Sequence, residues 1–148
     1  AHHMTSPDPD GDGQIRAMSA AIRDAELELS DIVHVNAHAT STKVGDLIEA
    51  RSVRTLLGSS ADQVALSATK SMTGHLLGGA GALETIFTLL ALRDRKAPPT
   101  INVTDPDPEL DLDLVRNTPR DLPAGQIAAI NNSFGFGGHN VALAVTTV

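Results

Sequence analysis

Three basic side chains follow short apolar runs of the sequence, and together they have the chemistry to hold a negatively charged oxygen. His38 comes two residues after the run Ile32–Asn36, and Lys70 and His75 come shortly after the run 64–67. Two imidazoles whose Nε2 hydrogens converge on one point stabilise a developing enolate oxygen, and a neighbouring lysine helps to tune and orient them. The sequence therefore indicates a site for an anionic intermediate, provided that the two loops meet in space.

The two apolar runs have the pattern of β-strands, so the candidate groups lie at strand ends. Periodic apolar residues predict amphipathic helices over about 13–27 and 44–56, the second closed by Gly58. A largely apolar stretch over about 78–93 predicts a third helix, which we expect to be buried and to end before Pro98-Pro99.

The C-terminal third contains two more strand-like runs, 126–131 and 141–148, which we expect to form an antiparallel hairpin. A glycine-rich loop over 132–139 joins them, and alternating leucines over 110–114 predict an edge strand. This order of elements predicts a single α/β domain, 1–148, in which helices cover a mixed sheet. Ligands of such sheets gather at the carboxyl ends of the strands.

Composition excludes several other classes of function. A formal net charge of −7 and a pI near 5.2 argue against nucleic-acid binding, which depends on lysine and arginine neutralising phosphates. The sequence contains no apolar run of about 18 residues, so we predict a cytoplasmic protein without membrane insertion. The absence of cysteine excludes disulfides and thiolate metal ligands, and it removes the commonest nucleophile of covalent acyl transfer.

The sequence does not predict a metal site or a nucleotide site. His34 and His38 have the spacing of a zinc motif, but on a strand they stand roughly 13 Å apart, whereas zinc ligands lie about 2 Å from the ion. The acidic run 8–13 resembles a calcium loop, yet its twelfth position is Ser19 rather than glutamate. Neither glycine cluster matches a phosphate-binding motif.

Five segments occur in the order and spacing that mark the elongating β-ketoacyl-acyl carrier protein synthases, and a sixth segment precedes them. The chain resembles the C-terminal part of such a condensing enzyme, of the KAS II type, over essentially its whole length. The segments are AHHMTSP (1–7), VNAHATST (35–42), GD (45–46), TKSMTGHLLG (69–78), PPTIN (98–102) and NSFGFGG (132–138).

The resemblance implies a thiolase-like fold, of which this chain is the C-terminal half within a five-layered αβαβα architecture. It implies a decarboxylative Claisen condensation, in which malonyl-carrier protein extends an enzyme-bound acyl group during fatty-acid elongation. It implies acyl carrier protein as a partner, a homodimer, and no cofactor, since phosphopantetheine arrives on the carrier protein. The nucleophilic cysteine of the family belongs to the N-terminal half of the enzyme, so this chain alone is expected to be inactive.

Residue roles follow from motif position within the same resemblance. His38 and His75 are the catalytic histidines, Lys70 is the site lysine, and Glu84 is its ion-pair partner or a purely structural salt bridge. Phe136 is the gating aromatic, and its backbone N–H contributes to the oxyanion hole. The predicted substrate-binding residues, whose alternative roles are turn capping and core filling, are Thr5, Thr40, Thr42, Phe134, Gly135, Gly137 and Gly138.

Three alternatives to a fatty-acid synthase stay open at the level of sequence. A polyketide ketosynthase uses the same residues, and a chain-length-factor-like subunit replaces the cysteine and leaves the chemistry to its partner. A non-catalytic module that docks carrier protein is the third. The presence of both histidines and of Lys70 favours an active enzyme.

Overall fold

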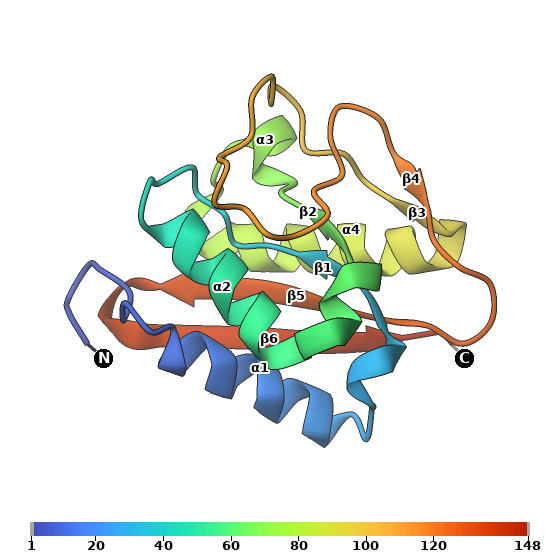
Figure 1. Ribbon diagram of the computed structural model, residues 1–148, viewed down its shortest axis with the longest axis horizontal. Helices are drawn as coiled ribbons and strands as arrows, with labels where there is room; N and C mark the ends of the chain where they lie inside the picture. The colour runs from blue at the N-terminus through green and yellow to red at the C-terminus, as the bar shows by residue number, and fades with distance from the viewer. Residues whose placement is uncertain (1, 148) are drawn as a thin grey trace.

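The computed structural model describes residues 2–147, which form a four-stranded mixed sheet with helices on both faces (Figure 1). The strand order is β2-β1-β5-β6, in which the first three strands run parallel and β6 runs antiparallel to β5. The bounds are Ile32–Asn36 for β1, Ala65–Ser67 for β2, Ala128–Gly135 for β5 and His139–Thr146 for β6. A separate antiparallel pair consists of β3, Lys96–Ala97, and β4, Arg120–Asp121.

Four α-helices and four 3-10 helices complete the described part. Helices α1 and α2 cover one face of the sheet, and α4 covers the other (Figure 1). None of these helices is both long enough and apolar enough to cross a bilayer. Their bounds are α1 Asp12–Asp24, η1 Leu29–Asp31, α2 Gly45–Leu57, η2 Gly58–Gln63, α3 Lys70–Thr73, η3 Leu77–Gly79, α4 Ala80–Asp94 and η4 Phe136–Gly138.

Local sequence explains where α1 begins and how it meets α2. Gly11 caps the helix with a φ of 67°, a left-handed conformation that glycine adopts without strain. Asp12 follows in the first turn, where its charge is favourable to the helix dipole. An added Cβ at Gly11 would lie 1.9 Å from the Ser52 hydroxyl oxygen, so glycine also permits the close approach of α2.

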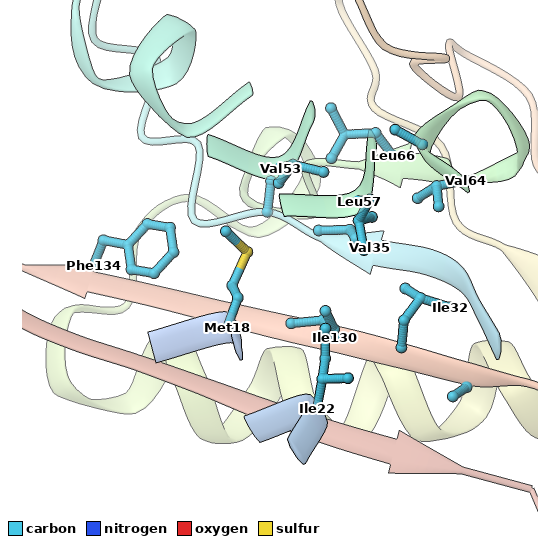
Figure 2. Close-up of a cluster of buried hydrophobic side chains, with 13 residues drawn as sticks. Met18, Ile22, Ile32, Val35, Val53, Leu57, Val64, Leu66, Ile130 and Phe134 are labelled. Atoms are coloured by element: carbon cyan, nitrogen blue, oxygen red, sulfur yellow. The ribbon is translucent and has the colours of Figure 1, made fainter. Parts of the chain in front are cut away.

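The main hydrophobic core lies between the sheet and the pair α1 and α2 (Figure 2). Met18 and Ile22 come from α1, and Val53 comes from α2. They meet Val35 of β1 and Ile130 of β5, which are both fully buried. Burying side chains of this size stabilises the fold by about 1.5–3 kcal/mol each before the entropic cost of folding.

The structure confirms most predicted elements and corrects the glycine-rich loop. Strand β1 has the predicted bounds, and α1 and α2 lie within three residues of theirs. The predicted loop 132–139 is wrong, because Asn132 to Gly135 continue β5 and pair with β6 up to His139. Polar side chains do not prevent ladder pairing, so the turn shrinks to Phe136–Gly138.

Two further expectations are wrong. Helix α4 is only half-buried, because Ile86 is 53% exposed and Leu89 is 48% exposed on the side away from the sheet. The leucines of 110–114 do not form a strand: Leu114 makes a single parallel bridge with Leu66, and Leu110 and Leu112 pack against the core as partly buried side chains.

Candidate active site

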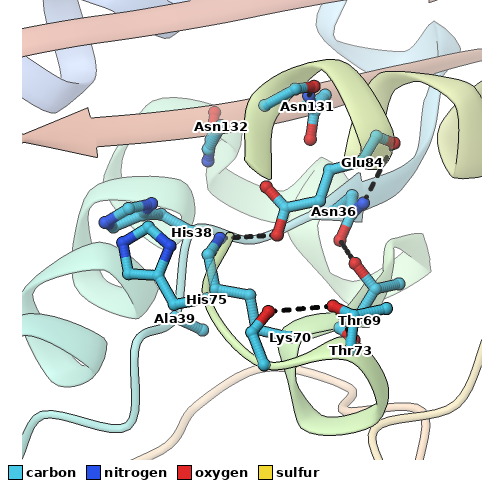
Figure 3. Close-up of polar contacts among 12 residues, drawn as sticks. Asn36, His38, Ala39, Thr69, Lys70, Thr73, His75, Glu84, Asn131 and Asn132 are labelled. Carbon is cyan, nitrogen blue, oxygen red and sulfur yellow. Dashed lines mark hydrogen bonds and ion pairs between the residues drawn. The ribbon is translucent and has the colours of Figure 1, made fainter. Parts of the chain in front are cut away.

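The two predicted histidines lie side by side at the carboxyl ends of β1 and β2 (Figure 3). The ring centroids of His38 and His75 are 5.6 Å apart, and the rings meet edge to face at 87°. The ring of Phe134 lies 6.2 Å from that of His38. Parallel neighbouring strands end at the same sheet edge, which brings together loops that are 37 positions apart along the chain.

Both imidazoles can donate a hydrogen bond from a ring N–H. The Nδ1 of His75 accepts the Leu77 N–H at 3.2 Å, so the proton of the neutral ring lies on Nε2. Burial, and to a smaller extent the charge of Lys70, lower the pKa of His38 to about 4. At neutral pH His38 is therefore uncharged, and its neutral imidazole keeps one ring N–H as a donor.

Lys70 and Glu84 form a buried ion pair beside the histidines (Figure 3). The Nζ of Lys70 lies 2.6 Å from Oε1 of Glu84, and the two side chains are 5% and 2% exposed. Burial raises the pKa of Glu84, and the hydrogen bond with Lys70 opposes that rise. The predicted partner of Lys70 is thus present, linking α3 to α4.

A polar network fixes the elements that hold this pair (Figure 3). The Thr69 hydroxyl donates to the side-chain oxygen of Asn36 at 3.1 Å, and the Asn36 amide donates to the backbone carbonyl of Glu84 at 3.2 Å. Asn36 and Thr69 are fully buried, so each hydrogen bond matters more than it would in water. Strand β1 is in this way tied to both α3 and α4.

Glu49 of α2 is a site residue that sequence reasoning missed. One carboxylate oxygen accepts the His38 N–H at 2.9 Å, and the other accepts the Ala39 N–H at 2.8 Å. The Asn132 amide donates to the first oxygen at 3.1 Å. Burial raises the pKa of Glu49, while these hydrogen bonds lower it. The carboxylate therefore holds the turn that presents the His38 ring, and Ala39 in that turn has a φ of 26°.

The residues predicted to bind substrate are only partly brought together. The hydroxyls of Thr40 and Thr42 lie 3.4 Å apart on the loop after His38. Thr5 lies on the N-terminal segment, where its N–H donates to His3 Nδ1. That segment also reaches the hairpin tip, because the Gly137 N–H donates to the Met4 carbonyl at 2.8 Å.

The two phenylalanines of the NSFGFGG segment have different environments. Phe134, 9% exposed, belongs to the hydrophobic core (Figure 2), and its ring also lies near that of His38. Phe136 is 74% exposed at the hairpin tip, between Gly135 and the adjacent Gly137 and Gly138. In this conformation Phe136 stands outside the group formed by Phe134 and the two histidines.

Residues 2–147 contain no group of three or more histidine, aspartate or glutamate side chains placed to hold a metal ion. His34, the partner considered for a zinc motif, is fully buried in β1. Its Nδ1 lies 2.8 Å from the Ala65 carbonyl, which identifies Nδ1 as the protonated nitrogen.

Comparison with known proteins decides the family. Residues 1–104 match the model of the β-ketoacyl synthase C-terminal domain. The chain belongs to the β-ketoacyl synthase family. It is 50% identical over 143 residues to 3-oxoacyl-[acyl-carrier-protein] synthase 2 of Staphylococcus aureus (strain COL), covering 97% of this chain and 34% of that protein. The chain thus spans about a third of the length of the curated relatives it matches.

Solved ketosynthase structures share the fold. A β-ketoacyl synthase from Burkholderia phymatum superposes with a TM-score of 0.88 at 37% identity, covering 99% of this chain and 34% of the other. A type II polyketide ketosynthase in complex with its acyl carrier protein gives a TM-score of 0.88 at 33% identity, covering 100% and 36%. The predicted family and the predicted thiolase-like α/β fold, as a C-terminal half, are confirmed.

Proposed function

We propose that this β-ketoacyl synthase chain is the C-terminal part of an elongating 3-oxoacyl-[acyl-carrier-protein] synthase. The observation that carries the proposal is the pair of imidazoles, His38 and His75, placed edge to face beside the buried pair Lys70–Glu84. The 50% identity to the Staphylococcus aureus synthase supports fatty-acid elongation as the pathway.

The reaction proceeds by decarboxylation followed by carbon–carbon bond formation. As the malonyl thioester loses carbon dioxide, the electrons of the breaking bond move into a thioester enolate. The Nε2 hydrogens of His38 and His75 donate to the enolate oxygen, where the negative charge develops. The enolate carbon then attacks the acyl thioester on the enzyme, and the thiolate departs. Donors fixed before the reaction stabilise this charge without reorganisation.

The nucleophile must come from outside this chain, which contains no cysteine. We assign the nucleophile to a preceding N-terminal part of the enzyme, which the matched relatives contain and this chain does not. We expect that part to pack on the exposed side of α4. Apolar residues on α4 and on the same face of β6 support this contact, because large apolar patches mark interaction surfaces. Those residues are Ile86, Leu89, Leu90, Val141 and Leu143, all at least 37% exposed.

Phe136 and the glycines around it are assigned to gating. The backbone of Gly137 has a φ of 71°, so the tip can carry the exposed Phe136 ring toward or away from His38. Thr40, Thr42 and Thr5 are assigned to the phosphopantetheine arm, which hydroxyl groups can hydrogen-bond along its amides. With the arm supplied by acyl carrier protein, we expect no cofactor, and we expect a cytoplasmic homodimer in which 1–148 form one domain.

A polyketide ketosynthase is the second candidate. The solved polyketide ketosynthase in complex with its carrier protein supports it at 33% identity, below the 50% of the fatty-acid relative. A chain-length-factor-like role requires no enolate stabilisation by this chain, whereas both imidazoles and Lys70 are in place. Fatty-acid elongation is therefore the preferred assignment.

The test uses the full-length protein that contains this chain. His38→Ala and His75→Ala should each reduce decarboxylation of malonyl-carrier protein by about 10²–10³-fold, since each removes one donor worth about 3 kcal/mol. His2→Ala, which removes an exposed imidazole, serves as the control and should behave like wild type. Undiminished decarboxylation in both site variants would remove the assigned roles, and an inactive wild type would remove the function itself.

A further inference from the structure

The segment Pro98–Ile101 lies against the turn that carries Lys70, and no step of the reaction above uses it. Three hydrogen bonds join the two stretches. The Ser67 hydroxyl donates to the Pro98 carbonyl at 2.5 Å, the Ala68 N–H donates to the Thr100 hydroxyl at 2.9 Å, and the Ile101 N–H donates to the Ser71 hydroxyl at 3.0 Å. We call this segment, 98–101, the outer clamp.

The Thr100 hydroxyl takes the place of a strand carbonyl at the edge of the sheet. On the outer edge of β2, the Leu66 N–H donates to the Asp113 carbonyl, and the Val115 N–H donates to the Leu66 carbonyl. The next N–H on that edge, two residues further, belongs to Ala68, and its acceptor is Thr100 Oγ1. The Thr100 hydroxyl thus accepts the Ala68 N–H. In a regular sheet, a backbone carbonyl of a longer neighbouring strand would accept it.

Thr100 is itself held rigidly. Its N–H donates to the Val115 carbonyl at 2.7 Å, and its carbonyl accepts the Asn117 N–H at 2.9 Å. Only 6% of the residue is exposed. A buried threonine with both backbone groups paired offers its hydroxyl at a fixed position, which is the requirement for aligning another element.

Lys70 lies between the two residues that the outer clamp holds. Ala68 precedes it by two positions and Ser71 follows it, and consecutive residues of the clamp bind both. From the inner side, Thr69 is tied to Asn36 of β1. The backbone of Lys70 is therefore fixed from two directions, although its ammonium group makes its ion pair elsewhere, with Glu84.

We propose that Thr100 and Ser71 are positioning residues, which act through the Lys70 backbone to aim its ammonium group at Glu84 and the two imidazoles. The effect on catalysis rests on the proposed function, whereas the positioning itself rests on the hydrogen bonds of the outer clamp. Misplacing a catalytic group by about 1 Å costs on the order of 100-fold in rate, even when the altered residue lies away from the chemistry.

The charge of Lys70 also acts on its neighbours, which gives the proposal a second signature. The groups around Lys70 are Glu84 of α4, His38 after β1, His75 after α3 and Asp46 of α2. Lys70 helps to lower the pKa of His38, so a Lys70 that drifts away raises that pKa. The acid limb of the decarboxylation profile should then move to higher pH.

The experiment compares Thr100→Val with Thr100→Ser in the full-length protein. Valine keeps the shape and removes the acceptor, and it should lower kcat for malonyl decarboxylation by about 10–100-fold with little change in KM. The acid limb should shift upward in the same variant. Thr100→Ser retains the hydroxyl and should restore both properties. Thr118→Val is the control, because Thr118 is exposed in the same C-terminal stretch and should resemble wild type.

A readout that needs no activity separates this inference from the proposed function. Acetic anhydride labelling followed by mass spectrometry reports how accessible each lysine amine is. Lys70, at 8% exposure, should be protected in wild type and several-fold more reactive in Thr100→Val, while labelling of the exposed Lys96 stays constant.

Two results would overturn the clamp. One is a Thr100→Val protein with wild-type Lys70 labelling, kcat and pH profile. The other is a loss that Thr100→Ser does not restore and that follows the unfolded fraction alone. If Thr100→Val does not fold, Ser71→Ala takes its place, with Lys70 labelling, kcat and the pH profile measured in the same way. An inactive wild type with clamp-dependent Lys70 labelling would reject the function and leave the positioning intact.

Discussion

The central sheet has an apolar cluster on both faces, and the face under α4 adds buried hydrogen bonds from Asn36 and Asn131 to that helix. Toward α1 and α2, the sheet presents Val35 and Ile130, which meet Met18 and Val53 in an apolar core (Figure 2). Toward α4, the same strands present Asn36 and other polar side chains that are equally buried. Alternation along each strand separates the two sets, since successive residues point to opposite faces.

The face under α4 combines a smaller apolar cluster, which includes Val33, Ala129 and Leu92, with buried hydrogen bonds near the site. The Asn131 amide donates to the Gly81 carbonyl and to the Thr85 hydroxyl, and the Thr88 hydroxyl donates to the Glu84 carbonyl. Gly81 lets the helix approach, because an added Cβ there would lie 2.9 Å from the Ser133 hydroxyl oxygen. Buried polar groups contribute little net stability, but they fix geometry once each has a partner.

The difference teaches that the Lys70–Glu84 pair is positioned from the side of the sheet under α4, while the larger apolar core lies on the other side. The apolar face holds the strands in register, and the face under α4 aims Lys70 and, through Asn36 and Thr69, the turn that carries it. A substitution in the larger apolar core should therefore change stability alone, whereas a substitution at the ion pair should change both stability and rate.

The largest effect is expected at the buried ion pair. Glu84→Ala leaves the Lys70 ammonium buried without its partner, which should lower the free energy of unfolding by about 4 kcal/mol in the full-length protein. Replacing both partners, Lys70→Met with Glu84→Leu, should return stability to wild-type level or above while decarboxylation stays lost. Urea unfolding and a carbon dioxide release assay measure the two quantities. A double variant as unstable as Glu84→Ala would contradict the division between the faces.

On the apolar face the effect should be purely one of stability. Ile130→Ala opens a cavity against Met18 and Val53, and it should reduce the free energy of unfolding by about 3 kcal/mol. Below its melting temperature this variant should keep kcat within about twofold of wild type, because Ile130 lies on the face opposite to α4, which carries Glu84. A matched loss in kcat at temperatures where the variant is fully folded would show that the faces are coupled.

The sequence predicts the two faces of the sheet to different extents. The period-two pattern of Ile32–Asn36 gave the strand, and the motifs around His38 and His75 gave the two groups that meet at its end. The packing of the apolar face could be predicted from periodicity, because apolar residues at helical or strand spacing all lie on the side of the element that is buried. The ion pair of Lys70 with Glu84 could be predicted only from the resemblance to the family.

The role of Glu49 could not be read from the sequence. A glutamate in an amphipathic helix is typical of a solvent-exposed face, and its true partners are two backbone N–H groups that carry no residue signal. Its third partner, Asn132, lies 83 positions away in a segment predicted as a loop. Local patterns likewise overstated the burial of α4, since an all-round apolar helix in an isolated chain exposes whichever side the sheet does not cover.

A smaller effect is expected at Glu49, which links the polar groups to α2. Glu49→Gln keeps one acceptor oxygen but places an amide donor against a backbone N–H, so it should cost about 2 kcal/mol of stability. The turn after His38 should loosen, and decarboxylation should fall about tenfold beyond any loss of folded protein. Glu28→Gln, at an exposed glutamate, is the control. A Glu49→Gln enzyme with wild-type kcat would show that the His38 turn needs no carboxylate.

The smallest expected effect concerns His34, which is buried in β1. Burial lowers its pKa to about 4, against the Ala65 hydrogen bond that raises it, whereas the unfolded chain has a histidine pKa of about 6.5. The unfolded state therefore binds a proton first as the pH falls, so the stability due to neutral His34 is complete above pH 6.5 and is lost toward pH 4. At pH 5.5 the loss should be about 1 kcal/mol.

His34→Gln tests this prediction, because glutamine can still donate to the Ala65 carbonyl and does not titrate. The fall in unfolding free energy between pH 7.5 and 5.5, measured by urea titration, should be about 1 kcal/mol smaller in the variant than in wild type. Glu49 and Glu84 have raised pKa values, so their contribution to stability increases as the pH falls, opposite to that of His34. Wild type and His34→Gln both contain these two glutamates. The difference between the two slopes therefore belongs to His34, and identical slopes would mean that β1 opens to water before His34 is protonated.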